Sequence, residues 1–219
     1  MKSTEIPGVF KEKNRIFTEN LKSSIGIKVY NEKLVKYKGK EFRSWNPYRS
    51  KLAAAILNGL SINIKSSSEV LYLGAATGTT VSHISDILKD GLVYSIENSP
   101  IAVKKLIEVC EKRKNIIPIL EDAFHPDRYS LIVPTVDIVY QDISQRNQAE
   151  IFIENINRYL KKGGIGIIMV KARSIDVSLE PKKAFDLVCS KLEDSSFKIL
   201  KKINLSPYEK DHAAIMISI

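Results

Sequence analysis

EVLYLGAATGTTVSHISDILK, residues 69–89, is the stretch that decides how the rest of the chain is organised. A run of β-forming residues reaches Gly74, small residues lead to Gly78, and two threonines follow. Apolar residues then recur at helical spacing from Val81 to Leu88. The stretch therefore predicts a buried strand, a tight glycine-containing loop and a helix.

The same strand-then-helix pattern continues to the C-terminus. It predicts strands over 69–74, 92–97, 116–120, 136–142 and 165–172, and helices over 79–89, 99–113, 148–162 and 180–193. The helix over 148–162 is expected to stop at Gly163–Gly164. Alternating units of this kind predict an α/β, Rossmann-like fold with a mainly parallel sheet and helices on both faces. Two final strands, over 197–207 and 212–219, have no helix between them and should form an antiparallel pair at or near one edge. This expected arrangement resembles that of class I methyltransferases.

The first 46 residues follow a different pattern. Apolar and polar residues alternate, and turn signals fall at Asn31–Glu32 and Lys38–Gly39, which predicts a small antiparallel sheet of short hairpins. Asn46–Pro47 then interrupts the pattern, and YRSKLAAAILNGL predicts a helix that ends near Gly59. We therefore expect a small N-terminal β domain over 1–46 and a larger domain over 47–219.

The composition is that of a soluble globular protein with a positive charge. Thirty-four Lys and Arg against 25 Asp and Glu give a net charge of +9, which favours a polyanionic partner such as RNA. A solvated, lysine-rich surface explains the same number. No apolar run approaches the ~18 residues of a membrane span, and MKSTEIPGVF lacks the apolar core of a signal peptide. Two isolated cysteines and three histidines argue against a metal site or disulfides, so we expect a cytoplasmic protein without a metal.

The glycine spacing bears on which ligand the loop binds. A dinucleotide loop needs G-x-G-x-x-G to seat a pyrophosphate, whereas Gly74 and Gly78 are spaced G-x-x-x-G with no third glycine. That spacing opposes a nicotinamide-dependent oxidoreductase and favours a nucleoside ligand without phosphate, such as S-adenosylmethionine. A tight strand-to-helix turn without any ligand also explains the glycines.

Acidic residues follow three successive strands. Glu97 ends the second strand, where it could accept hydrogen bonds from ribose hydroxyls, and Asp122 and Asp142 follow the third and fourth. Asp122 could meet the exocyclic amine of adenine. Singly, each acid could be a helix cap or a solvated charge; jointly they predict a nucleoside pocket with an acidic wall.

Three further residues stand where chemistry could occur. Lys171 ends the fifth strand at the expected active edge, with Asp142 expected beside it, although a lysine there could also extend to solvent. Lys51 lies in the first turn of its helix and could be a surface residue, and His212, before the last strand, could be structural or exposed.

Several segments together closely resemble the fibrillarin family. They are YRSKLAAAIL, VLYLGAATGTTVSHISDI, VYSIENS, EDAFHP, VYQDISQ, the lysine of MVKARSID, and YEKDHA, which span the chain from about residue 40. The N-terminal hairpins resemble the small extra domain of the archaeal members. The glycine-arginine-rich tail of eukaryotic fibrillarins does not precede these segments, so the chain looks like an archaeal member.

The resemblance implies an S-adenosylmethionine-dependent RNA 2′-O-methyltransferase without a metal, acting on rRNA and tRNA. It implies a Lys-Asp-Lys-His catalytic set, which falls on Lys51, Asp142, Lys171 and His212. Cofactor binding is expected from the glycine loop and the strand ends, at Gly74, Ala75, Thr79, Thr80, Glu97, Asn98, Asp122, Ala123, Asp142, Ile143, Ser144 and Gln145. In three places the chain departs from the family: Thr77 stands for a frequent serine, Asn98 for an aromatic residue and Arg146 for a frequent proline.

The resemblance also implies partners. The family works in the box C/D small ribonucleoprotein with a guide RNA, a Nop-domain scaffold protein and a kink-turn-binding protein of the ribosomal L7Ae type. A different class of function is a non-catalytic assembly subunit that keeps the fold and the cofactor pocket. The presence of all four expected catalytic residues disfavours that alternative.

Overall fold

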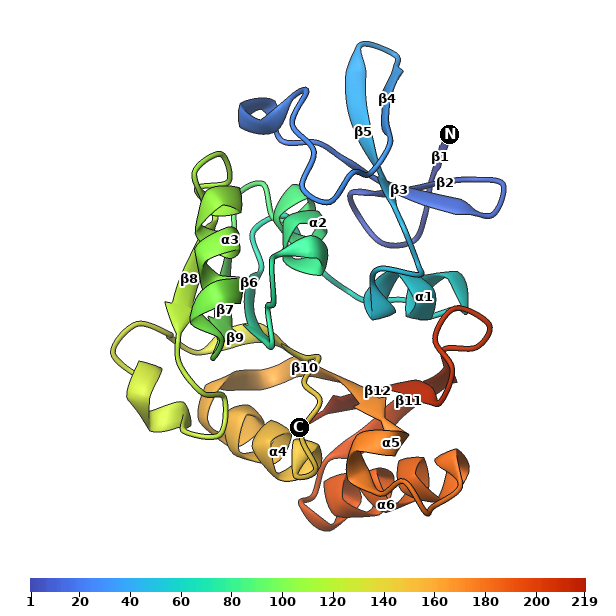
Figure 1. Ribbon diagram of the computed structural model, residues 1–219, viewed down its shortest axis with the longest axis vertical. Coiled ribbons are helices and arrows are strands. Elements are labelled where there is room, and N and C mark those ends of the chain that lie inside the picture. Colours follow the sequence, from blue (N-terminus) through green and yellow to red (C-terminus); the bar gives the residue numbers. More distant parts are fainter.

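The computed structural model describes residues 1–219 and contains two separate β-sheets (Figure 1). The smaller sheet is antiparallel, with strand order β1-β2-β3-β5-β4. Its strands are β1 (Lys2–Ser3), β2 (Val9–Glu12), β3 (Arg15–Glu19), β4 (Leu34–Tyr37) and β5 (Lys40–Trp45). The β4–β5 hairpin turns at Lys38 and Gly39, both with positive φ, as the turn signal predicted. The hairpin sheet expected in the N-terminal part is therefore confirmed, and the domain division at residue 46 stays a prediction.

The larger sheet has seven strands in the order β11-β12-β10-β9-β6-β7-β8. Strands β10, β9, β6, β7 and β8 are parallel to one another, while β12 is antiparallel to both β10 and β11. The bounds are β6 (Glu69–Leu73), β7 (Leu92–Glu97), β8 (Ile116–Leu120), β9 (Val136–Gln141), β10 (Leu160–Lys171), β11 (Lys198–Asn204) and β12 (His212–Ser218). The α/β class and the antiparallel pair at one edge are confirmed.

Helices cover both faces of this sheet (Figure 1). On one face lie α1 (Lys51–Leu57), α2 (Thr79–Ile87) and α3 (Pro100–Cys110), and on the other lie α4 (Gln148–Tyr159) and α6 (Pro181–Asp194). Alternate residues of β6 divide between two buried clusters, with Val70 and Tyr72 facing α1 and Leu71 and Leu73 facing α4. The clusters contain 28 and 27 residues, so the strands are covered equally on both sides, as a parallel sheet requires.

The helix expected over 148–162 ends earlier than predicted. Leu160 already has an extended backbone and pairs with Val136, so β10 begins there and passes through the two glycines. A Cβ on Gly164 would lie 2.9 Å from the Asp137 carbonyl oxygen, which shows how closely the two strands approach. The prediction that Gly163–Gly164 stops the helix is therefore wrong. The glycines permit an irregular strand pairing instead.

A buried polar network joins the N-terminal sheet to α2. The Arg43 guanidinium on β5 contacts Glu32 at 2.6 Å and Asp86 at 2.8 Å, and Asp86 also contacts Arg113 at 2.6 Å. The charged groups of these residues are almost entirely excluded from solvent. Two carboxylates therefore balance two guanidinium groups in the interior, which such burial requires.

His83 of α2 belongs to the same interface. Its Nδ1 lies 2.7 Å from the Thr18 hydroxyl, its Nε2 lies 2.7 Å from the Tyr30 hydroxyl, and its ring stacks on Trp45. Because Thr18 donates its own proton to Asp86, His83 Nδ1 must be the donor to Thr18. Burial, with Arg43 and Arg113 nearby, holds the pKa of His83 well below its usual value, so the ring is neutral.

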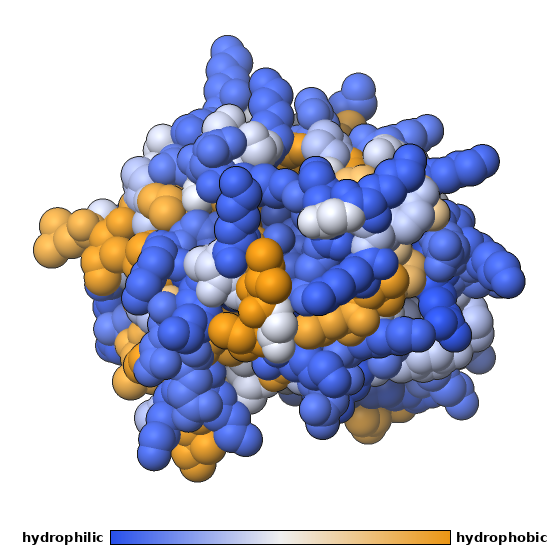
Figure 2. Space-filling model, turned by 90° about the horizontal axis from the view of Figure 1, so that it is seen from above, coloured by the Kyte–Doolittle hydropathy of each residue, from blue (hydrophilic) through white to orange (hydrophobic).

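No helix is both long enough and apolar enough to cross a membrane. Viewed from the side of the N-terminal sheet, the surface is mostly hydrophilic, with separate hydrophobic patches between long polar side chains (Figure 2).

Candidate functional site

The glycine loop lies where the order of the parallel strands reverses. Gly74 follows β6 and Asp142 follows the neighbouring β9, and the Asp142 N–H bonds the Leu73 carbonyl at 2.9 Å. A Cβ on Gly74 would lie only 2.4 Å from the Asp142 carbonyl oxygen, and the φ of Gly74 is +84°. Glycine is therefore required here for two reasons, the close backbone approach and the left-handed conformation. Such reversal points are where ligands bind in open α/β sheets.

A pocket of about 300 Å³ opens beside this loop. Nine of the residues expected to bind the cofactor line it, and they come from the ends of four strands. The lining consists of Gly74, Ala76, Ile96, Glu97, Asn98, Glu121, Asp122, Ala123, Asp142, Ile143, Ser144 and Gln145. It has four carboxylates and no lysine, arginine or histidine, which fits a cationic nucleoside and opposes a phosphate. The sequence reasoning did not single out Glu121, since a charged residue one position before Asp122 gives no separate signal.

Two of these acids also hold the backbone of their own loops. Glu97 accepts hydrogen bonds from the N–H groups of Ala76 and Ser99, at 2.8 and 2.9 Å. Asp122 accepts one from the Phe124 N–H at 3.0 Å. Each carboxylate oxygen has lone pairs to spare, so both acids can shape the pocket and still accept bonds from a ligand.

Three residues expected to bind the cofactor do not line the pocket: Ala75, Thr79 and Thr80. Thr80 is buried, and its hydroxyl donates to the Ser50 hydroxyl at 2.9 Å. Ser50 in turn caps the N-terminus of α1 by accepting from the Ala53 N–H. Thr80 therefore connects the helix after the glycine loop to the helix that begins with Lys51. The sequence reasoning missed Ser50, although a serine before an alanine-rich helix is a capping signal.

Lys51 and Asp142 form an ion pair, with 2.9 Å between the ammonium and a carboxylate oxygen. Lys51 is the first residue of α1, and both side chains are partly buried, at 21% and 16% exposed. Sequence reasoning placed Asp142 beside Lys171. The ammonium that reaches Asp142 belongs to Lys51, and no carboxylate lies within 4.0 Å of the Lys171 ammonium.

Lys171 and His212 lie opposite each other at the C-terminal edge of the sheet. They pair in the register of β10 and β12. The strand alternation that carries Met169 and Ala214 toward α1 directs Lys171 and His212 to the same face. Asp142 follows Tyr140 on that face by the same alternation. The four residues expected to be catalytic therefore gather at one edge, on the α1 side of the sheet.

Hydrogen bonds fix the backbone and the ring of these two residues. Gln148, at the start of α4, accepts from the Lys171 N–H at 3.0 Å and donates to its carbonyl at 3.2 Å. His212 Nδ1 lies 2.6 Å from the Lys210 carbonyl oxygen. Because a carbonyl only accepts, Nδ1 carries the hydrogen and Nε2 is the nitrogen left for a ligand.

Two buried tyrosines pack against each other on the strands that lead to the site. Tyr72 on β6 and Tyr140 on β9 are register partners with ring centroids 4.5 Å apart. Burial raises the pKa of both phenols, and the negative charge of Asp142 raises them further, so both stay protonated.

Two departures from the family pattern lie at the site surface. Asn98 lines the pocket and is exposed, and Arg146 is exposed in the loop that follows β9.

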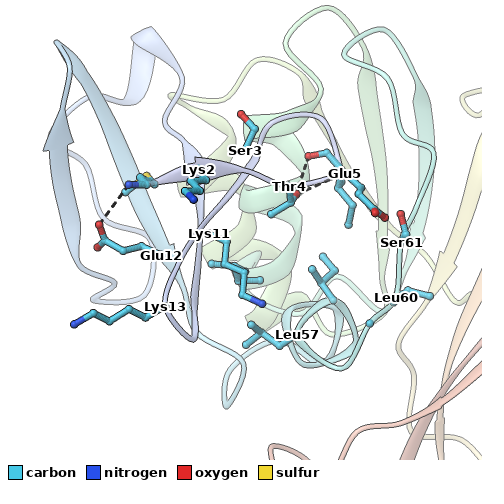
Figure 3. A pocket seen from close by; sticks show the side chains of 15 residues that line it. Lys2, Ser3, Thr4, Glu5, Lys11, Glu12, Lys13, Leu57, Leu60 and Ser61 are labelled. Atoms are coloured by element: carbon cyan, nitrogen blue, oxygen red, sulfur yellow. Dashed lines mark hydrogen bonds and ion pairs between the residues drawn. The ribbon is translucent and has the colours of Figure 1, made fainter.

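Another cavity, of about 650 Å³, lies between β1, β2 and the end of α1 (Figure 3). Figure 3 shows Lys11 extending toward Leu57 across it. It contains none of the expected site residues, so its larger volume does not make it the active site.

Known proteins resemble this chain over nearly its whole length. The fibrillarin family model matches residues 1–219. The chain is 51% identical to a fibrillarin-like rRNA/tRNA 2′-O-methyltransferase of Methanothermobacter thermautotrophicus over 211 residues, covering 96% of this chain and 93% of that one. Aeropyrum pernix fibrillarin with natively bound S-adenosyl-L-methionine superposes with a TM-score of 0.89 at 39% identity, over 99% of this chain and 96% of that one. The fibrillarin of a fibrillarin/Nop5p complex gives a TM-score of 0.90 at 42% identity, over 100% and 99% of the two chains.

Proposed function

Because this chain belongs to the fibrillarin family, we propose that it transfers a methyl group from S-adenosylmethionine to ribose 2′-hydroxyls of rRNA and tRNA. The observation that carries the proposal is the site itself: an acidic pocket adjoins Asp142, and Lys51, Lys171 and His212 gather at the same edge. Asp142 lines the pocket and pairs with Lys51, so a ligand in the pocket would lie next to this ion pair.

The acidic pocket would hold the methyl donor. The glycine loop approaches Asp142 closely, and Glu97 and Asp122 offer acceptors from adjoining strand ends. These acceptors suit ribose hydroxyls and an exocyclic amine, and the four carboxylates suit a positively charged ligand. The donor supplies an already activated methyl group on its sulfonium.

The protein must then align the reacting atoms and handle one proton. A ribose 2′-hydroxyl is a poor nucleophile until its proton is drawn away. The Lys171 amine has no carboxylate partner, and we assign to it the orientation or deprotonation of the hydroxyl. Lys51 balances the charge of Asp142, and His212 offers Nε2 to the ribose or the adjacent phosphate.

In this proposal, the partners determine which nucleotide of the RNA is methylated. We propose that a Nop-domain scaffold protein, a kink-turn-binding protein of the ribosomal L7Ae type and a box C/D guide RNA assemble with the chain. The relative crystallised with Nop5p supports the scaffold. Base pairing of the guide RNA would supply sequence choice, because a basic surface attracts RNA without reading its sequence.

One reconstitution tests the proposal. The protein is incubated with methyl-labelled S-adenosylmethionine and target RNA, with and without the scaffold, the kink-turn protein and the guide. Label on a ribose 2′-oxygen in the assembled sample, lost with Lys171→Ala, is the expected result. A protein that binds S-adenosylmethionine but transfers no label in any sample would instead be an assembly subunit without catalytic activity.

A further inference from the structure

A second groove, of about 690 Å³, lies between the N-terminal sheet and the start of α1. Its walls come from the β2–β3 turn, the segment before β4, the turn that joins β5 to α1, and the loop between β11 and β12. None of the residues expected to be catalytic or to bind the cofactor lines it. The groove is therefore separate from the acidic pocket.

The groove is positively charged. Arg15, Lys33 and Arg49 line it, all three are exposed, and none has a carboxylate within 4.0 Å. The only acid in the lining is Glu32, whose buried carboxylate lies 2.6 Å from Arg43. Since Arg43 balances Glu32, the three free cations set the charge, and a polyanion is the complementary ligand.

Two tyrosines add flat apolar surface between these charges. Tyr48 is 63% exposed and meets the partly exposed ring of Tyr208 edge to face, with 5.3 Å between the centroids. Unpaired cations next to accessible aromatic rings are typical of surfaces that bind RNA, because phosphates pair with the cations and bases stack on the rings.

The position of the groove relates it to the active edge. Tyr48 and Arg49 belong to a turn closed by bonds to Asn46, and this turn leads directly into Lys51, the first residue of α1. Tyr208 lies in the loop that leads into His212, the first residue of β12. The groove is therefore lined by the two segments that lead into Lys51 and His212, two of the expected catalytic residues.

We propose that this groove binds the RNA strand that carries the target ribose, with Arg15, Lys33 and Arg49 on its phosphates and Tyr48 and Tyr208 against its bases. The inference rests on the proposed function and adds to it the path by which the substrate strand approaches the active edge. The cavity of Figure 3 is a weaker candidate, because Glu5 and Glu12 stand among its lysines and no aromatic residue lines it.

The test uses the reconstituted particle and measures the KM for target RNA at several salt concentrations. Arg49→Gln and Lys33→Gln should each raise the KM and reduce the slope of log affinity against log salt by about 1. Tyr48→Leu, which keeps an apolar contact with Tyr208, should raise the KM about tenfold with little change in the salt slope. Affinity for S-adenosylmethionine should remain at the wild-type value in all three.

Lys104→Gln serves as the matched control, because Lys104 is an exposed lysine of α3 outside the groove. Photo-crosslinking from benzoylphenylalanine at position 48 adds a readout that does not depend on turnover, and label should fall on the target strand near the methylated nucleotide. Wild-type KM and salt slope in the three groove variants overturn the proposal, as does crosslinking confined to the guide RNA or to the scaffold protein. If the wild-type particle transfers no methyl group, the proposed function fails instead, and crosslinking still reports whether the groove holds RNA.

Discussion

The ammonium of Lys51 lies 2.9 Å from the carboxylate of Asp142, and this pair joins the first turn of α1 to the end of β9, 91 residues away in sequence. The pair leaves the amine of Lys171 without a carboxylate partner at the same edge of the sheet. The two lysines therefore have different surroundings, and their substitution should have different consequences.

Lys51→Met should lower turnover about 100-fold or more, because Asp142 would then face the pocket with an unbalanced charge. Asp142→Asn should lower it as well, and the double variant should lose little more than either single variant, since both act through one pair. Single-turnover methylation of target RNA measures this. Losses that simply add in the double variant would show that the two residues act independently.

Lys171→Ala should abolish most turnover while S-adenosylmethionine still binds, since Lys171 does not line the acidic pocket. Calorimetric titration of the cofactor and single-turnover methylation of the same preparation separate the two effects. Near-normal turnover with normal cofactor binding would refute the role that we assign to Lys171.

Thr80→Val removes the hydroxyl that donates to Ser50 and should lower turnover by loosening α1 and Lys51. Ser50→Ala should act in the same way and also cost about 1 kcal/mol of stability through the lost cap. Thr80→Ser keeps the hydroxyl and should restore turnover. If Thr80→Val weakens cofactor binding and Ser50→Ala does not, Thr80 contacts the cofactor directly.

The stability of the protein should fall in mild acid because of His83. Its pKa is lowered in the folded protein, so the unfolded chain binds the proton first as the pH drops. The free energy of unfolding should therefore decrease below about pH 6.5, the ordinary value for histidine, and keep decreasing toward the lower folded-state value. Urea unfolding at several pH values measures this. In the His83→Asn variant, although it is less stable overall, the free energy of unfolding should change less with pH over the same range. An equal pH dependence of the unfolding free energy in both proteins would show that another group causes the acid sensitivity.

Arg43→Met should destabilise the protein by about 3–5 kcal/mol, because Glu32 and Asp86 would remain buried with too little positive charge. Lys40→Met removes an ion pair with Glu19 whose lysine side chain is 58% exposed, and should cost at most about 1 kcal/mol. Thermal unfolding of the two variants in parallel gives the comparison. Equal losses of stability in the two variants would mean that the buried network stabilises the protein no more than a surface ion pair does.

The strands, their sequence of helices and the residue types at their ends could be predicted because they depend on local patterns. Alternating strand and helix signals gave the parallel sheet, and in a parallel sheet the residues that follow the strands must meet at one edge. Glu97, Asp122 and Asp142 line one pocket for that reason.

Local patterns did not predict burial or helix ends correctly where a second element packs against a segment. The apolar stripe from Val81 to Leu88 predicted the helix α2 but not its full burial. His83 and Asp86, which lie outside that stripe, are also buried, beneath the N-terminal sheet. The end of α4 was also misplaced, because the pairing of Leu160 with Val136 overrides the helical pattern that continues beyond it.

The sequence by itself therefore determined the fold class and the family, since these follow from periodicity and from segments read along the chain. It also predicted nine of the residues that line the acidic pocket. Only the tertiary structure decided which lysine pairs with Asp142, that Thr80 bonds Ser50, and that cations from distant segments share a groove. Contacts of this kind depend on strand order and on how α1 docks against the sheet, and side chains far apart in sequence acquire defined distances only once those elements are packed.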